Sequence, residues 1–247
     1  MISFSKEQIF IITGASSGIG EGIALLINSL GATVIAIGRN QERLLSLKSK
    51  SKNPDSLFLE QKDLTENISE LPNYIRTLKD KYGKFTGLVC SAGMDMPSPL
   101  VALDLNNGKS LFDINYFAPI FLAKGFVDKR VNIGLGASVV FIASTAGVYP
   151  EKGQTFYAAS KAALIAGAKS ISKEISHRGL RCNCISPAFV DTPMYQKNKE
   201  SIGTDLSNYA LGIGKPSDLA DMTVFLLSNK ARWITGQNYI LDGGCFG

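Results

Sequence analysis

Tyr157 and Lys161 stand four residues apart in the segment YAASK, which reads as part of a helix. Residues at this spacing share one helical face, so the ammonium group can lie beside the phenol. A phenol is a poor acid at neutral pH, with a reference pKa of about 10. A neighbouring positive charge favours its ionised form and lowers that pKa. The pair could therefore exchange a proton with a substrate oxygen, although the same spacing also occurs on ordinary helix surfaces.

A serine and an asparagine could assist this pair. Ser144 follows the apolar run 137–143, which predicts a strand, and ligands of open α/β folds bind beyond the carboxyl ends of strands. Its hydroxyl could bind the same substrate oxygen as Tyr157. Asn115 lies in the segment 111–131, which predicts a long helix containing Pro119. Because proline lacks an N–H, either the carbonyl of Asn115 is free to hold a water molecule or the helix simply kinks there.

A glycine-rich turn lies between the apolar run 8–13, which predicts a strand, and a helical pattern that continues to Leu30. Glycines let the backbone approach phosphates closely, and the start of a helix supplies free N–H groups and a positive dipole end. The turn therefore predicts a dinucleotide-phosphate site. Its candidate residues are Gly14, Ser16, Ser17, Gly18, Ile19 and Gly20.

The same turn also matches G-x-S-x-G, the nucleophile elbow of hydrolases, with Ser16 as the nucleophile. A hydrolase of this kind needs a base, and the chain has one histidine, His177, in the charged segment KEISHRG. No acidic partner for His177 stands out in the sequence. We interpret the match as a coincidence and His177 as a surface residue at the end of a helix.

Arg39 indicates which dinucleotide the chain binds. The run 33–37 predicts a second strand, and Gly38 and Arg39 follow it. At this strand end, an acidic residue binds the ribose 2′-hydroxyl of NAD. The sequence offers no carboxylate there, and a guanidinium suits a 2′-phosphate. Arg39 therefore predicts NADPH, the alternative being a solvated arginine at the start of a helix.

Two further strand ends carry candidate cofactor contacts. After the run 56–60, Asp63 could hydrogen-bond the adenine amino group or cap the next helix. After the run 86–90, the small residues Ala92 and Gly93 allow close approach of a ligand to the backbone.

Predicted strands and helices alternate along the whole chain, with further strands at 180–186 and 238–241. This order predicts an α/β fold of the Rossmann type, in which a doubly wound parallel sheet of about seven strands carries helices on both faces. No linker divides the chain, so we expect a single domain over residues 1–247. The polar stretch 193–208 has no strong period and predicts a mobile loop that covers the site.

The composition excludes several classes of protein. The chain has 247 residues, of which 45% are hydrophobic, so it can bury a sizeable core. A net charge of +5 suits an anionic ligand, but no Lys/Arg block indicates nucleic acid. No apolar run is as long as a membrane span, and the N-terminus lacks a secretion signal. We therefore expect a cytoplasmic protein without nucleic-acid or membrane partners.

The four cysteines show no metal-binding spacing, so we expect no metal site and reduced structural thiols. Cys182 and Cys184 flank one residue of a strand-like run, and we expect them on opposite faces of the sheet.

Taken together, these motifs resemble those of the classical short-chain dehydrogenase/reductases, in the same order and over nearly the whole chain. The matching elements are TGASSGIG at 13–20, Asp63-Leu64, SAG at 91–93, Asn115, Ser144, Tyr157 with Lys161, Asn183 with Pro187, Thr192, and LDGG at 241–244.

The resemblance implies an oxidoreductase that transfers a hydride from NADPH to a carbonyl carbon and produces a secondary alcohol. Tyr157 would be the general acid and Ser144 would hold the carbonyl oxygen. Lys161 would bind the nicotinamide ribose and lower the pKa of the tyrosine, and Asn115 would hold a water molecule. The implied cofactor contacts are Gly14, Ser16, Ser17, Gly18, Ile19, Gly20, Arg39, Asp63, Leu64, Ala92, Gly93, Tyr157, Lys161, Pro187, Val190 and Thr192.

Two residues depart from the family pattern. Ser91 stands where the family usually has asparagine, and we expect a weaker structural hydrogen bond between strands. Ala188 stands where the family usually has glycine, and we expect an altered nicotinamide loop. Neither departure removes a catalytic group.

Within the family, the chain looks most like the bacterial 3-oxoacyl-[acyl-carrier-protein] reductases of fatty acid biosynthesis. Arg130 and Arg178 fall roughly where that group has basic residues that dock the acidic carrier, or they are solvated. A reductase of sugars, steroids or small ketones would show the same motifs, and we expect the substrate determinants in 94–104 and 193–208. A catalytically silent NADP-binding sensor or scaffold is the non-enzymatic alternative. The family also implies a homotetramer or dimer.

Overall fold

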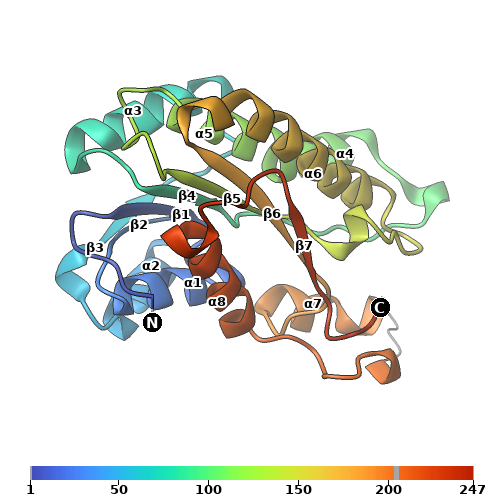
Figure 1. Ribbon diagram of the computed structural model, residues 1–247. Helices are drawn as coiled ribbons and strands as arrows, with labels where there is room; N and C mark the ends of the chain where they lie inside the picture. Colours follow the sequence, from blue (N-terminus) through green and yellow to red (C-terminus); the bar gives the residue numbers. More distant parts are fainter. Residues whose placement is uncertain (1, 203–205, 247) are drawn as a thin grey trace.

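One parallel sheet forms the centre of the computed structural model, which describes residues 2–202 and 206–246 (Figure 1). The strand order is β3-β2-β1-β4-β5-β6-β7. The strands are β1 Ile9–Thr13, β2 Thr33–Gly38, β3 Leu57–Gln61, β4 Gly87–Cys90, β5 Ser138–Ile142, β6 Arg181–Pro187 and β7 Asn238–Leu241. The order reverses between β1 and β4, the place where doubly wound folds bind ligands. The expected Rossmann-type fold is confirmed.

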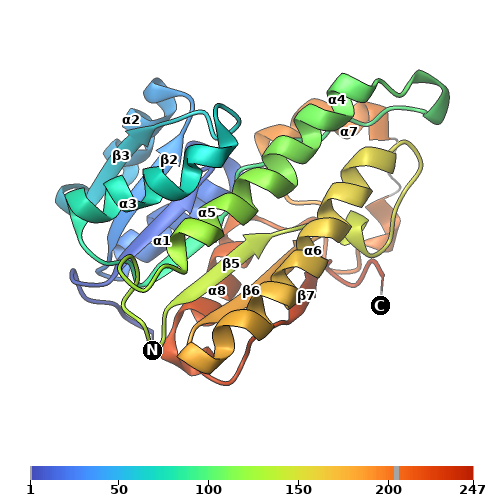
Figure 2. The same cartoon turned by 90° about the horizontal axis from the view of Figure 1, so that it is seen from above.

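Helices cover both faces of the sheet, as Figures 1 and 2 show. One face carries α1 Gly18–Ser29, α2 Gln41–Lys50 and α8 Pro216–Leu227, and the other carries α3 Leu71–Tyr82, α5 Ala118–Phe126 and α6 Thr155–Ile175. Two further helices are α4 Leu105–Phe112 and α7 Pro193–Ile202. None of these described helices is long and apolar enough to cross a membrane.

Each face of the sheet has its own hydrophobic core. Successive residues of β1 alternate between them: Ile11 packs with the α3–α5–α6 side and Ile12 with the α1–α2–α8 side. Both faces are covered, so the central strands β1, β2, β4 and β5 are apolar at nearly every position. The expectation for Cys182 and Cys184 is wrong, because residues two apart in a strand share a face. Both pack with Cys90 in one core.

The helical segment around Asn115 differs from the expected helix 111–131. It begins at α4, where the Asp104 carboxylate accepts a hydrogen bond from the N–H of Asn107 at 2.9 Å. A π-helical turn, Asp113–Phe117, then leads into α5, which ends at Phe126. Pro119 lies in the first turn of α5, where its missing N–H disrupts the ordinary α-helical pattern. The π turn takes up this irregularity, and it contains Asn115.

The segment 193–208, expected as a loop, begins with the helix α7. Pro193 opens it, and the Thr192 hydroxyl accepts a hydrogen bond from the N–H of Tyr195 at 3.2 Å. Proline at the first helical position and a capped N–H are ordinary helix-start signals. Residues 203–205 of the expected mobile loop lie outside the described residues.

Candidate active site

Tyr157 lies in the first turn of α6, and Lys161 follows one turn later, as expected. The Lys161 Nζ lies 5.8 Å from the centroid of the Tyr157 ring. Lys161 is 5% exposed, and its Nζ donates a hydrogen bond to the carbonyl of Ile142 at 3.0 Å. The lysine thereby ties α6 to the end of β5, the strand that positions the serine.

Ser144 lies just beyond β5, and its Oγ accepts a hydrogen bond from the N–H of Ala146 at 3.1 Å. The short turn that follows packs tightly on α6, since a Cβ on Gly147 would lie 2.8 Å from the N–H nitrogen of Ala162. This packing brings the Ser144 hydroxyl to Tyr157, with which it forms a hydrogen bond. The fold thus places the two hydroxyls together, as the sequence predicted.

Burial sets the acidity of Tyr157 and Lys161. Desolvation raises the pKa of Tyr157 to about 12, against the opposing hydrogen bond with Ser144. Desolvation also lowers the pKa of Lys161 to about 8. The expected lowering of the tyrosine pKa by Lys161 is therefore wrong for this arrangement: the phenol is desolvated, and the ammonium is bonded to Ile142 instead. A phenol with a raised pKa stays protonated at neutral pH, which is the form a general acid needs.

The Asn115 side chain anchors the loop that follows β4. Its Oδ1 accepts a hydrogen bond from the N–H of Met94 at 3.0 Å, and its Nδ2 donates to the Met94 carbonyl at 2.9 Å. The same Nδ2 donates to the Oγ of Ser160, the neighbour of Lys161, at 3.2 Å. Asn115 therefore holds the loop against α6, while the water at its backbone carbonyl stays a prediction.

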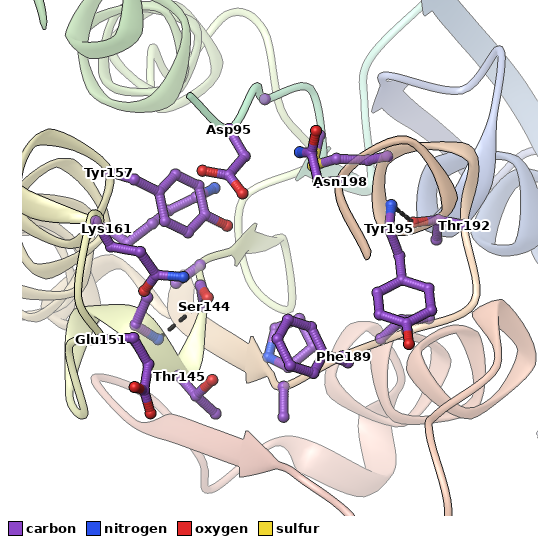
Figure 3. A pocket seen from close by; sticks show the side chains of 18 of the residues that line it. Asp95, Ser144, Thr145, Glu151, Tyr157, Lys161, Phe189, Thr192, Tyr195 and Asn198 are labelled. Atoms are coloured by element: carbon purple, nitrogen blue, oxygen red, sulfur yellow. Dashed lines mark hydrogen bonds between the residues drawn. The ribbon is translucent and has the colours of Figure 1, made fainter. Parts of the chain in front are cut away.

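Ser144, Tyr157 and Lys161 line one pocket of about 620 Å³ (Figure 3). This volume is in the usual range for small-molecule sites. Aromatic side chains form much of its wall: the ring centroid of Phe189 lies 5.4 Å from that of Tyr195, and the rings of Tyr149 and Phe246 stack at 4.7 Å. The pocket therefore combines an apolar wall with a small set of polar groups around Tyr157.

Several polar residues of the pocket were not singled out from the sequence, among them Asp95, Gln154 and Asn198. Asp95 and Asn198 do fall within the segments 94–104 and 193–208, where we expected the substrate determinants. The sequence did offer one signal for Asp95: it is a carboxylate, and it lies two residues after Gly93, where small residues end a predicted strand. Nothing in the local sequence distinguishes Gln154.

The glycine-rich turn connects β1 to α1 as expected. Gly14 has a φ of +66°, and a Cβ there would lie 2.7 Å from the N–H nitrogen of Ala92, so glycine lets the ends of β1 and β4 approach. A Cβ on Gly20 would lie 2.3 Å from the Gly14 carbonyl oxygen. Ser17 is the N-cap residue of α1, and its hydroxyl makes no capping hydrogen bond. The hydroxyl and the first N–H groups of α1 are therefore suited to a phosphate.

The turn lies beside the loop that follows β6. A Cβ on Gly18 would lie 3.1 Å from the Cγ2 of Thr192, and Ile19 lines the pocket together with Thr192. Pro187 and Val190 line the same pocket. The sheet edge thus brings the candidate phosphate turn and the candidate nicotinamide loop together.

Ala92 and Gly93 lie at the end of β4, next to the turn and the catalytic group. The N–H groups of Ser91 and Ala92 both donate to the Thr13 hydroxyl at 3.2 Å, so the Thr13 side chain joins the end of β4 to β1. A Cβ on Gly93 would lie 3.4 Å from the Lys161 Nζ. Leu64, by contrast, is buried in the hydrophobic core.

Arg39 and Asp63 meet at the ends of β2 and β3. An Arg39 nitrogen lies 3.6 Å from an Asp63 oxygen, and the Arg39 side chain is 73% exposed. Asp63 also accepts hydrogen bonds from the N–H and hydroxyl of Thr65. Burial raises the pKa of Asp63, but these hydrogen bonds and the Arg39 charge outweigh it and lower the pKa. The sequence-based statement that no carboxylate lies here needs correction, because β3 supplies one that β2 lacks.

Arg130, His177 and Arg178 lie away from the pocket. Arg130 precedes β5, and His177 and Arg178 precede β6, so all three are at the amino edge of the sheet, opposite to the carboxyl edge that carries the pocket. Arg130 makes a bidentate contact with Asp128, at 3.1 and 2.7 Å. His177 is therefore remote from Ser16 and cannot act as its base. Within the described residues, no cluster of His, Cys, Asp or Glu could hold a metal ion.

Comparison with known proteins identifies the family. A family model described as enoyl-(acyl carrier protein) reductase matches residues 14–245. The chain belongs to the short-chain dehydrogenase/reductase family. It is therefore an oxidoreductase of CH–OH and C=O groups, in a family that uses nicotinamide cofactors.

Similar proteins have the same length and fold. A 3-oxoacyl-[acyl-carrier-protein] reductase of Thermotoga maritima is 33% identical over 97% of this chain and 98% of its own. A protein of the same description from Rickettsia prowazekii is 36% identical over 95% of each chain. The solved aldohexose dehydrogenase of Thermoplasma acidophilum is 28% identical, with a TM-score of 0.86 over 98% of this chain and 96% of its own.

Proposed function

We propose that this protein is an NADPH-dependent reductase that converts a ketone to a secondary alcohol, with 3-oxoacyl thioesters as the first candidate substrates. The observation that supports this most directly is the hydrogen-bonded pair of hydroxyls, Ser144 and Tyr157, on the wall of the pocket with the buried Lys161 behind them. The curated relatives act on 3-oxoacyl groups bound to an acyl carrier protein, according to their names.

The residues present suit a nicotinamide dinucleotide. Ser17 leaves its hydroxyl and the first N–H groups of α1 available for a phosphate, and Arg39 is exposed just after the end of β2. Val190 and Thr192 would hold the carboxamide, and Lys161 would hold the ribose next to it. When bound, this cofactor supplies the hydride.

Tyr157 donates its proton to the carbonyl oxygen as the carbonyl carbon is reduced. The raised pKa keeps the phenol protonated until it is used. Ser144 donates a hydrogen bond to the same oxygen and stabilises the negative charge that develops on it. Lys161 has a pKa near physiological pH, about 8, and can therefore exchange protons with its surroundings during turnover.

A sugar or another small ketone is the second candidate substrate class. The pocket favours it in one respect, because a carboxylate, Asp95, lies on its wall. The structural similarity to an aldohexose dehydrogenase agrees with this possibility. Arg130 and Arg178 are not part of the proposal, since they lie at the opposite edge of the sheet from the pocket of the same protomer.

The remaining proposals concern the whole protein. We propose a single domain over residues 1–247, a substrate segment at 193–208 that moves on binding, and a homotetramer or dimer in the cytoplasm. The single sheet that runs through the chain supports the first of these. The strand β7 lies at the edge of the sheet, where a second copy of the chain could pair with it, and this supports self-association.

The test is the oxidation of NADPH with acetoacetyl thioesters and a panel of ketones, in the wild type and in Tyr157→Phe. We expect the variant to lose turnover by about 100-fold or more, while its dissociation constant for NADPH changes little. Tyr116→Phe is the matched control, because Tyr116 lies outside the pocket. Retained turnover in Tyr157→Phe would contradict the assignment. NADPH binding with no turnover of any ketone would favour a sensor or scaffold.

A further inference from the structure

Asp95 places a carboxylate beside the reacting groups of the pocket. It lies in the loop after β4, two residues beyond Gly93, and the hydrogen bonds from Asn115 to Met94 hold that loop in place. Figure 3 shows the carboxylate next to the Tyr157 ring, with Asn198 of α7 on its other side. Its negative charge acts on both Tyr157 and Lys161.

The carboxylate is incompletely satisfied. It forms a hydrogen bond with Asn198, but its Oδ1 is buried and accepts no hydrogen bond from any described residue. Burial raises the pKa of Asp95, against the Met96 N–H, the Lys161 charge and Asn198. A buried acceptor without a donor is unfavourable, and such groups are uncommon in folded proteins. An unpaired acceptor in a binding pocket therefore indicates a donor on the ligand.

Gln154 repeats the pattern on another part of the same wall. Its Oε1 is buried and unpaired among the described residues, and it also lines the pocket. Gln154 is the N-cap residue of α6, yet its side chain makes no capping hydrogen bond. Two unpaired acceptors that line one pocket fit a ligand with hydroxyl groups better than a hydrocarbon chain.

The donor that suits Asp95 is neutral. The Lys161 ammonium already lies near enough to lower the pKa of Asp95, so it would repel a cationic ligand group at the same place. The terminal torsion of an aspartate is soft, so one oxygen can turn to the ligand while the other stays toward Asn198. A substrate hydroxyl meets both conditions.

We propose that Asp95, assisted by Gln154, makes the pocket selective for carbonyl substrates that carry a hydroxyl group next to the reacting carbonyl. This inference rests on the proposed carbonyl reduction and favours its second substrate class: hydroxyketones, including keto sugars, over the 3-oxoacyl thioesters, which carry no hydroxyl group at that place. An unsubstituted alkyl group at the same place would leave the carboxylate oxygen unpaired, and a site built for a hydroxyl rejects the analogue that lacks it.

The test compares hydroxyacetone with 2-butanone, which differ by a hydroxyl in place of a methyl group of similar size. The measured quantity is the ratio of the two kcat/KM values with NADPH, because a change in this ratio cancels the different intrinsic reactivities of the two ketones. We expect the ratio to fall by about tenfold or more in Asp95→Leu, which corresponds to about 1.4 kcal/mol. In Asp95→Asn we expect about a threefold fall, since a neutral amide oxygen accepts a weaker hydrogen bond.

Glu151→Gln is the matched control, because it removes an exposed carboxylate at the same pocket whose oxygens are free to be hydrated. We expect its ratio to stay within about twofold of the wild type. An unchanged ratio in both Asp95 variants would overturn the role of Asp95 while leaving the proposed reduction intact. If the wild type reduces neither ketone nor any acetoacetyl thioester, the proposed function itself fails. If Asp95→Leu does not fold, Asp95→Asn still tests the proposal, because it keeps the shape of the side chain.

Discussion

At the scale of single residues, the fold disfavours the charge of Lys161. Its ammonium is buried and its pKa falls to about 8, well below the value of a lysine in water. The folded protein therefore binds fewer protons than the unfolded chain between about pH 8 and the ordinary lysine pKa. The buried charge of Lys161 therefore lowers the free energy of unfolding at neutral pH, and this loss disappears as the pH rises through the window.

The variant Lys161→Met tests the direction of this pH dependence. We expect the variant to be more stable than the wild type at pH 7, by up to about 3 kcal/mol, because it replaces a buried charge with an apolar side chain of similar length. The lost hydrogen bond to Ile142 reduces the gain. The difference should shrink between pH 8 and 10, as measured by urea unfolding. A gain that does not change with pH would contradict the lowered pKa.

Arg39 tests the choice of cofactor at the same scale. We expect Arg39→Ala to weaken NADPH by about tenfold and NADH by much less, since a charge-assisted contact to the 2′-phosphate is lost. The exposure of Arg39 and its contact with Asp63 keep this effect modest. Fluorescence titration of both cofactors measures it. Equal binding of NADPH and NADH by the wild type would remove the basis of the argument.

At the scale of elements, the start of α1 depends on the contact between two glycines. A Cβ on Gly20 would lie 2.3 Å from the Gly14 carbonyl oxygen, so the backbone of the turn has to move to accommodate a methyl group. That movement displaces the N–H groups that we propose as the phosphate site. The turn and the helix thus act as one unit.

We therefore expect Gly20→Ala to weaken NADPH by about tenfold or more and to lower the thermal midpoint, although alanine favours helices over glycine by about 1 kcal/mol. The control is Gly167→Ala in α6, where the added methyl group meets the flexible end of Ile120 at 3.1 Å. It should change neither NADPH affinity nor the midpoint greatly. Calorimetric titration and thermal scans give both readings. Unaltered NADPH affinity in Gly20→Ala would argue against the turn as the phosphate site.

At the scale of the whole molecule, Arg181 joins α8 to the sheet. It is 5% exposed, and its guanidinium donates to the carbonyls of Leu226 at 2.6 Å and Ser228 at 3.3 Å. Those carbonyls lie at the carboxyl end of α8, where helices leave acceptors unpaired. The Ser138 hydroxyl also donates to the Leu226 carbonyl and the Ala231 N–H to the Ser228 carbonyl, each at 3.2 Å, so the arginine adds a charged donor to carbonyls that already have a neutral one.

Arg181→Met should lower the free energy of unfolding by about 2 kcal/mol, because it removes two charge-assisted hydrogen bonds to buried carbonyls. Arg130→Met is the matched control: the Arg130 side chain is 77% exposed, and its ion pair with Asp128 should contribute less than about 1 kcal/mol. Urea unfolding measures both variants. Equal effects of the two substitutions would show that the buried guanidinium is not needed to join α8 to the sheet.

The sequence alone was sufficient for the fold class, for the strands and for the helix that carries Tyr157 and Lys161. Apolar runs that end in glycines or small polar residues, and an i, i+4 spacing, are local signals, and the fold that they predict is confirmed. Their order also supported the family, although Asn115 lies in a π turn and not in the expected α-helix. The roles of the candidate site residues stay predictions.

Only the tertiary structure decided how remote groups meet. It brought Asp63 to Arg39 from a different strand, and it placed Asp95 and Asn198 together from segments about 100 positions apart in the chain. It also reversed the expected shift of the Tyr157 pKa, because desolvation depends on packing from every side, and spacing along one helix does not report it. For the same reason the unpaired acceptors of Asp95 and Gln154, which carry the proposed substrate preference, could be found only in the folded chain.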